Sequence, residues 1–261
     1  MITLGKNSTI HPTAIIDPDV TLIMGDNSFI GPLTNVSGCS VIKIGDHCKI
    51  HRLSFINVNS DVTIGHNCWI GERCIIDGTA QLDIGNNVGI GIGTSIWSHA
   101  AAGDRFSGCR IRASKSIKIG DHAWLMGSLV VQASDIASRV LIMPGSNVNK
   151  DLLIPNRIWS GNPIADVTDV MGGAPWNEVS IAQKRKRFEL LLVTYEQDTG
   201  QNWHNNFVCV SSPGSLHDEQ SDNVTYFNVD DCTYTKCGSD AEQRFIQWML
   251  KHNKAKFIPV T

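Results

Sequence analysis

A four-residue signature returns along this chain at a fixed spacing. Each copy is an aliphatic residue, Gly and two polar residues. The copies are Met24-Gly25-Asp26-Asn27, Ile44-Gly45-Asp46-His47, Ile64-Gly65-His66-Asn67, Ile84-Gly85-Asn86-Asn87 and Ile119-Gly120-Asp121-His122. The first four copies are 20 residues apart, and the fifth follows 35 residues after the fourth. A regular period of this length is typical of stacked structural units, so it constrains the fold more than any other feature.

A shorter repeat of six residues lies within each period. Aliphatic residues occupy its first position at Ile10, Ile16, Ile44, Ile50, Ile56, Ile64, Ile70, Ile76, Ile84, Ile90, Ile96, Ile136, Ile142 and Val148. Six residues suit a short strand and a turn, and they match no helical period. Three such units close a triangular coil of about 18 residues, and the two extra residues of each period project at one corner. The sequence therefore predicts an all-β solenoid with the aliphatic residues inside.

The cysteines follow the same register. Cys48, Cys68 and Cys74 share a position that Val88 and Ala123 hold in other units, and the chain contains no Cys-x-x-Cys pair. A position shared by Cys, Val and Ala is a small core position. We therefore expect buried thiols there rather than disulfides or metal ligands.

This repeat resembles that of the hexapeptide-repeat acyltransferases, over residues 8–167. The resemblance implies a left-handed parallel β-helix, acetyl-coenzyme A as co-substrate, and a homotrimer with active sites in clefts between adjacent coils. A carbonic anhydrase on this fold binds zinc through a His and a further pair of His five residues apart. Here position 117 is Ile, so His122 lacks that partner, and His47 and His51 are four residues apart. We predict no metal.

Charge and hydropathy exclude some classes of binding partner. The formal net charge is −3, with 42% hydrophobic and 18% charged residues. This gives no electrostatic footprint for nucleic acid or for an anionic membrane. No signal peptide and no run of 18 apolar residues occurs, so we expect a cytoplasmic protein without a membrane span.

The period breaks once. The interval from Ile84 to Ile119 exceeds one period by 15 residues, and the extra length follows Ile96-Trp97-Ser98-His99. Residues 100–116 are predicted to form a loop that projects from the solenoid. Long loops in compact domains are often functional, so this interruption is the expected location of the site.

His99 stands at the base of this loop, where the resemblance places the catalytic His of relatives that acetylate hydroxyl groups. A sugar hydroxyl must lose its proton as it attacks a thioester. An imidazole, with an ordinary pKa near 6.5, can accept that proton at neutral pH. The alternative is a structural His packed against Trp97. Asp77 and Asp83, on the preceding coil, are the candidates for orienting His99.

Three further residues are candidates for substrate binding. Trp124 follows His99 by 25 residues, and the resemblance implies an aromatic wall beside the acetyl group. The alternative is a Trp that anchors a coil corner. Asp104 and Arg105, in the loop, are candidates for contacting an anionic acceptor or the phosphates of coenzyme A. The alternative for them is a solvated loop.

The last coils resemble the part of the family that lines the acetyl-coenzyme A groove. The resemblance implies that Gly127, Ser128, Gly145 and Ser146 let the pantetheine approach the backbone. It also implies that Lys150 meets a phosphate or an amide carbonyl.

The repeat ends near Pro163, and we place the domain boundary after Val167. Residues 168–261 are predicted to form a small α+β extension. Capping boxes begin at Ser180 and Ser239 and predict helices to about Gln197 and His252. Alternating residues at 208–210 and 224–229 predict two strands. No motif in this region indicates chemistry.

The sequence thus predicts an acetyl-coenzyme A-dependent O-acetyltransferase. Its acceptor is a sugar hydroxyl, in the synthesis of a cell-surface polysaccharide such as capsule or O-antigen, and its general base is His99. Two alternatives stay open. One is N-acetylation of an amino sugar nucleotide, whose amine is already nucleophilic. The other is a β-helix that only assembles or binds.

Overall fold

The computed structural model describes residues 1–101, 103–204, 206–210, 224–251 and 254–260, and for residues 208–210 it describes the backbone alone. These residues form two compact units, 1–176 and 177–261. The segment from 168 to 176, which the sequence boundary assigned to the extension, belongs to the first unit.

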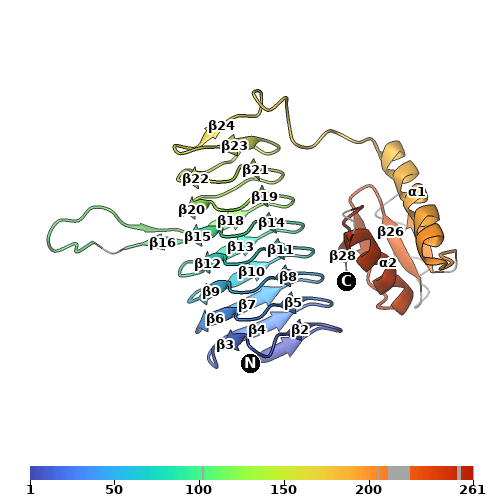
Figure 1. The fold of residues 1–261 in the computed structure, drawn as a ribbon, viewed down its shortest axis with the longest axis horizontal. Coiled ribbons are helices and arrows are strands. Elements are labelled where there is room, and N and C mark those ends of the chain that lie inside the picture. Colours follow the sequence, from blue (N-terminus) through green and yellow to red (C-terminus); the bar gives the residue numbers. More distant parts are fainter. Residues whose placement is uncertain (102, 205, 211–223, 252–253, 261) are drawn as a thin grey trace. The chain divides into compact units, whose positions relative to one another are not determined.

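The first unit is a solenoid whose coils each contribute a strand to three parallel sheets (Figure 1). Sheet 1 contains β1 (Ile2–Leu4), β4 (Thr21–Met24), β7 (Val41–Ile44), β10 (Val62–Ile64), β13 (Leu82–Ile84) and β18 (Ile117–Ile119). Sheet 2 contains β2 (Thr9–Ile10), β5 (Phe29–Ile30), β8 (Lys49–Ile50), β11 (Trp69–Ile70), β14 (Gly89–Ile90), β19 (Trp124–Leu125), β21 (Leu141–Ile142), β23 (Ile158–Ser160) and β24 (Ala165–Asp166). Sheet 3 contains β3 (Ile15–Ile16), β6 (Asn35–Gly38), β9 (Phe55–Val58), β12 (Ile75–Asp77), β15 (Ser95–Trp97), β20 (Val130–Gln132) and β22 (Asn147–Val148). The predicted β-solenoid is confirmed.

The register explains the 20-residue period. Ile42 pairs with Val62, which pairs with Leu82. Residues one period apart therefore stack directly, and their side chains form ladders inside the solenoid. Members of these ladders are almost fully buried, as Ile30, Ile50, Ile70, Ile90 and Leu125 illustrate. Each buried side chain of this kind contributes about 1.5–3 kcal/mol to folding. Among the described strands of these three sheets, only the final pair of sheet 2, β23 with β24, is antiparallel.

The polar residues of the signature hold adjacent coils together at the corner between sheets 1 and 2. The carboxylate of Asp46 accepts the backbone N–H of Asp26 at 2.8 Å, and Nδ1 of His66 accepts the N–H of Asp46 at 2.9 Å. Asp26, Asn86 and Asp121 accept a backbone N–H of the preceding coil in the same way. The preceding Gly is required because a Cβ on Gly25 would lie 2.1 Å from Oδ1 of Asp46.

The second polar position of the signature turns the chain. Asn27, His47, Asn67, Asn87 and His122 all have left-handed backbone conformations. Polar residues, and Asn above all, tolerate this conformation better than bulky ones. The corner histidines are partly buried between coils rather than fully solvated.

The expected buried thiols are confirmed. Cys48, Cys68 and Cys74 are at most 2% exposed, and the thiol of Cys48 donates to the carbonyl of Gly65 at 2.9 Å. Burial raises the pKa of Cys74. These thiols are therefore core groups.

The second unit packs two helices with a small mixed sheet, as expected for the extension. Its elements are α1 (Ile181–Thr199), β25 (Phe207–Val210), β26 (Thr225–Asn228), β27 (Thr233–Thr235), α2 (Asp240–Lys251) and β28 (Ile258–Val260). The sheet order is β25-β26-β27-β28. Its core is aromatic, with Phe188, Phe227 and Phe245 buried together.

Both helices begin where the sequence predicts. The reciprocal capping box of Ser180 and Gln183 opens α1, and a left-handed Gly200 ends it. Ser239 caps α2 by accepting the N–H of Glu242 at 3.2 Å. The Glu242 carboxylate does not complete a standard box. It instead accepts the N–H of Cys237 at 2.8 Å and the hydroxyl of Thr225 at 2.8 Å.

Candidate active site

The insertion is a β-hairpin that leaves the solenoid at the corner after sheet 3. In this hairpin β16 (His99–Ala100) pairs antiparallel with β17 (Ala113–Ser114), and His99 stands opposite Ser114. Figure 1 shows it as a long green projection from the stack. We call the hairpin and the residues between its strands the arm. The projecting loop expected at residues 100–116 is confirmed in its position.

His99, at the foot of the arm, is hydrogen-bonded to a buried carboxylate. Its Nδ1 lies 2.9 Å from Oδ2 of Asp77, which belongs to β12 on the preceding coil. A carboxylate with a low pKa can only accept, so Nδ1 of His99 carries the proton. Nε2 has no protein partner among the described residues, and its lone pair is available to a substrate. Of the two candidate partners, Asp77 contacts His99 and Asp83 does not.

A set of donors surrounds Asp77. Its Oδ2 also accepts the hydroxyl and the N–H of Ser98, at 2.9 and 3.1 Å. Its Oδ1 accepts Nδ2 of Asn57 at 2.9 Å and the hydroxyl of Thr79 at 2.7 Å. Burial alone would raise the pKa of Asp77, but the hydrogen bonds outweigh it and lower this pKa to about 2. Asp77 is therefore a fixed negative charge beneath the imidazole.

The sequence patterns did not identify the supporting donors Ser98, Asn57 and Thr79. A signal for Asn57 existed, because Asn57, Asp77 and Trp97 occupy the same register position on consecutive coils of sheet 3. The stacked position below Trp97 is the place from which a side chain reaches His99.

Trp124 lies away from His99 in the single chain. It is 46% exposed on the outer face of sheet 2, and its ring would be 3.1 Å from a Cβ added to the neighbouring Gly89. His99 lies at the corner between sheets 3 and 1, which is opposite the side that sheet 2 forms. One solenoid therefore does not bring these two residues together.

Asp104 and Arg105 lie near the tip of the arm. The Asp104 carboxylate accepts the N–H groups of Phe106 at 2.8 Å and Ser107 at 3.3 Å. Bonds from Ser107 and Phe106 lower the pKa of Asp104. Asp104 thus shapes the turn. Arg105 is exposed and has no ion pair among the described residues, and Phe106 beside it is fully exposed.

Lys115 anchors the returning strand of the arm. Its Nζ lies 2.6 Å from Asp151 and 3.1 Å from Asp135, on two successive coils, and its N–H bonds to the carbonyl of Ser98. These ion pairs raise the pKa of Lys115. The positive charge of Lys115 is therefore paired with carboxylates of the protein itself.

The residues expected to line the co-substrate groove lie at the corner between sheets 2 and 3. Gly127 and Ser128 stack on the preceding coil, because a Cβ on Gly127 would lie 3.0 Å from the carbonyl oxygen of Ile92. The Ser146 hydroxyl is buried, donating to Met143 and accepting from Gly161. Gly145, by contrast, has open space where a Cβ would stand.

Lys150 lies beyond this corner, after β22 in sheet 3. Its Nζ is 5.4 Å from the centre of the Trp159 ring, a cation–π contact at the end of the solenoid. The side chain is exposed, so its charge is still accessible to an anion from solvent.

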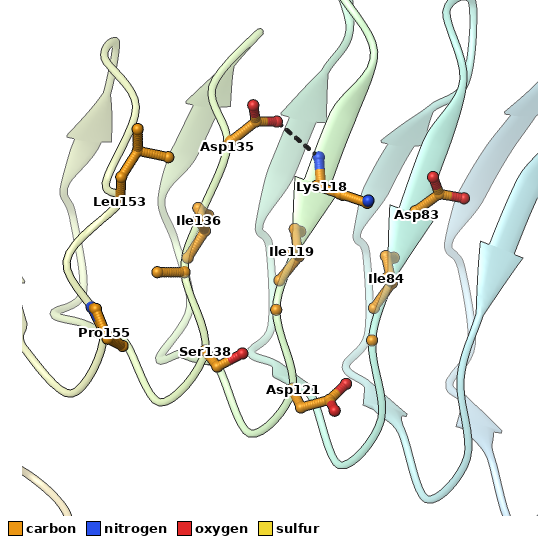
Figure 2. A pocket seen from close by; sticks show the side chains of 13 residues that line it. Asp83, Ile84, Lys118, Ile119, Asp121, Asp135, Ile136, Ser138, Leu153 and Pro155 are labelled. Atoms are coloured by element: carbon orange, nitrogen blue, oxygen red, sulfur yellow. Dashed lines mark hydrogen bonds between the residues drawn. The ribbon is translucent and has the colours of Figure 1, made fainter.

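A groove of about 730 Å³ lies on the outer face of sheet 1 (Figure 2). Its polar lining is acidic, with Asp83, Asp121 and Asp135 against Lys118. Of the residues that the sequence proposes for the site, it includes only Asp83, which does not contact His99. Negative charge of this kind opposes the binding of coenzyme A phosphates.

In the described part of the chain, no three His, Cys, Asp or Glu side chains gather in a way that could hold a metal ion. Among the described helices, none combines the length and the apolar character needed to cross a bilayer.

The solenoid is the fold of hexapeptide-repeat acetyltransferases, and similar solved structures include several of them. The polySia-specific acetyltransferase NeuO shares 19% identity over 72% of this chain and 93% of its own, with a TM-score of 0.48. Galactoside acetyltransferase in complex with coenzyme A shares 19% over 62% and 72%, with a TM-score of 0.43. A hexapeptide-repeat-containing acetyltransferase from Vibrio cholerae O1 biovar eltor, complexed with acetyl coenzyme A, shares 21% over 56% and 69%, with a TM-score of 0.39.

No family model matches the chain, and no curated protein sequence matches it. At these identities the structural similarity concerns the fold and does not identify a substrate.

Proposed function

We propose that this protein is an acetyl-coenzyme A-dependent O-acetyltransferase that acts on a sugar hydroxyl, with His99 as the general base. The observation that carries the proposal is the pair of His99 and Asp77. Nδ1 of His99 is held at 2.9 Å by a buried carboxylate, and Nε2 is left without a protein partner among the described residues. An imidazole held in this tautomer is prepared to accept a proton.

The reaction follows from that geometry. Nε2 of His99 removes the proton of the acceptor hydroxyl as its oxygen attacks the thioester carbonyl. The Asp77 charge stabilises the imidazolium that forms. The tetrahedral intermediate collapses with cleavage of the carbon–sulfur bond, and the imidazolium returns the proton to the departing thiolate. The products are the acetylated sugar and coenzyme A.

The other candidate residues have the roles that the resemblance implies, as parts of the same proposal. Gly127, Ser128, Gly145 and Ser146 border the co-substrate. Because the Ser146 hydroxyl is occupied, that residue acts through its backbone. Lys150 meets a phosphate or an amide carbonyl of acetyl-coenzyme A.

Arg105 contacts the acceptor, and Asp104 holds the turn that presents it. Trp124 borders the acetyl group. Since Trp124 lies away from His99 in one chain, it does so in a homotrimer, where a neighbouring copy brings the two residues together.

The biological setting is the synthesis of a cell-surface polysaccharide in the cytoplasm. Two of the similar structures carry names that point to carbohydrate substrates, polySia and a galactoside. N-acetylation of an amino sugar is less well supported, because an amine needs no base as firmly oriented as His99. A scaffold without activity leaves the buried charge of Asp77 unexplained.

The test is thiol release from acetyl-coenzyme A by the parent protein and by His99→Ala. The acceptors are methyl β-galactopyranoside, an oligomer of sialic acid, and glucosamine. We expect turnover with a hydroxyl acceptor and a loss of about 100-fold or more in the variant, the usual contribution of a positioned base. His11→Ala, a partly buried His on the first coil, is the matched control.

Both variants must keep the thermal melt and oligomeric state of the parent. Unchanged turnover in His99→Ala would refute the role of His99. Turnover with glucosamine alone would favour N-acetylation. No turnover with any acceptor, combined with no acetyl-coenzyme A binding, would favour the scaffold.

A further inference from the structure

We propose that Trp97, with the side-chain amides of Gln132 and Asn147, forms the platform that binds the acceptor sugar ring beside His99. This inference rests on the proposed function, and it names the residues and the chemistry by which the acceptor is recognised.

Trp97 and His99 are close together in the chain and both reach the surface of the solenoid. Trp97 ends β15 and is 37% exposed, and the residues on either side of it, Ile96 and Ser98, are completely buried. His99, two residues on, is also directed outward and partly exposed. Two residues of chain span at most about 7 Å, so the Cα atoms of Trp97 and His99 lie no farther apart than that. Side chains two residues apart on an extended chain point to the same side. A ring stacked on Trp97 would present its hydroxyls to Nε2 of His99.

Trp97 has polar neighbours on the following coils. Gln132 is its partner across the sheet, and Nε2 of Gln132 donates to Oδ1 of Asn147 at 2.9 Å. This contact fixes the orientation of both amides. Oε1 of Gln132 and Nδ2 of Asn147 have no partner among the described residues, although both side chains reach the surface. They provide an acceptor and a donor, which is what sugar hydroxyls require.

The strands of sheet 3 carry almost no charge. All strands of sheet 3 lie in the described part of the chain, and their only charged residue is the buried Asp77. The exposed face that these strands form is therefore uncharged. Coenzyme A phosphates find no counter-charge there. An aromatic face combined with a few fixed amides suits an uncharged polar ring.

The experiment compares Trp97→Ala, Trp97→Phe and Gln132→Ala with the parent protein. Trp69→Ala is the matched control, because Trp69 is equally exposed, at 38%, but lies on sheet 2. Each variant is assayed for the KM of acceptor and of acetyl-coenzyme A. Equilibrium binding of methyl β-galactopyranoside and of the sialic acid oligomer is measured without acetyl-coenzyme A.

We expect Trp97→Ala to weaken acceptor binding and to raise the acceptor KM roughly tenfold, the loss of one well-placed aromatic contact. Trp97→Phe should retain most of the affinity, Gln132→Ala should weaken binding of the same acceptor, and Trp69→Ala should resemble the parent. The KM of acetyl-coenzyme A should not change in any of them.

Three results would overturn the inference: an unchanged acceptor KM in Trp97→Ala, a change in oligomeric state instead, or no binding of either probe by the parent. A change in oligomeric state would assign the uncharged face to contact between subunits. The binding measurement separates this inference from the proposed function. Loss of acceptor binding in Trp97→Ala with full turnover in His99→Ala would support the platform and reject the general base.

Discussion

Asp77 is the residue on which the site depends, and its charge also contributes to stability. Its pKa in the folded protein is about 2, below the ordinary value of 3.8. A depressed pKa means that the ionised form stabilises the fold above pH 4, and that this contribution is lost as the pH falls from about 4 to 2. A shift of this size corresponds to about 2 kcal/mol.

Urea unfolding between pH 5 and pH 2 tests this expectation. The parent protein should lose about 2 kcal/mol more than Asp77→Asn over that range, because the variant has no carboxylate to protonate. Asp19→Asn is the control, since Asp19 is an exposed carboxylate near the N-terminal end of the stack. Parallel curves for the parent and Asp77→Asn would show that the pKa of Asp77 is not depressed in the native state.

The arm is the element that positions His99, and its base is fastened from two directions. β16 and β17 pair with each other, and Lys115 binds Asp135 and Asp151 on the coils that follow. Exposed ion pairs contribute little individually, up to about 1 kcal/mol. The two ion pairs of Lys115 together should nevertheless reduce the opening of the hairpin at its base.

Lys115→Ala should therefore increase amide hydrogen exchange at β16 and β17 by about fivefold, the equivalent of about 1 kcal/mol. The global melt should change little, because the solenoid core is untouched. Lys118→Ala is the matched control, as Lys118 is exposed on β18 and has no side-chain ion pair among the described residues. Equal exchange in the two variants would indicate that the ion pairs of Lys115 do not hold the arm.

At the scale of the whole molecule, the solenoid is a stack in which each coil contacts its neighbours alone. Its cohesion comes from side-chain ladders such as Ile44, Ile64 and Ile84, all at most 4% exposed. A charge placed in a ladder has no partner and cannot reach water. Damage to one coil is transmitted to both coils beside it.

Ile64→Asp should destabilise the first unit by roughly 3–5 kcal/mol in urea unfolding. Thr63→Asp, on the same strand but exposed, should cost less than about 1 kcal/mol. The pair has the same new charge and the same position along the stack, so the difference reports burial alone. A similar loss in both variants would contradict the ladder as the source of stability.

Local sequence patterns were enough to predict the solenoid, the buried cysteines, the two capped helices and the position of the arm. Each of these depends on local chemistry repeated along the chain. An aliphatic residue every six positions, a Gly that permits close stacking and a capping Ser act on neighbours whose separation the period already states. The break in that period located His99 in the same way.

The tertiary structure was needed to show that Asp77, and not Asp83, contacts His99. It was also needed to show that Lys115 is held in ion pairs and that Trp124 lies away from His99 in one chain. Asp77 and His99 are 22 residues apart, one period and two residues more. Whether such residues meet depends on the corner at which the chain turns and on the side to which each side chain points. Those directions are set by the packing of complete coils, and no six-residue pattern contains them.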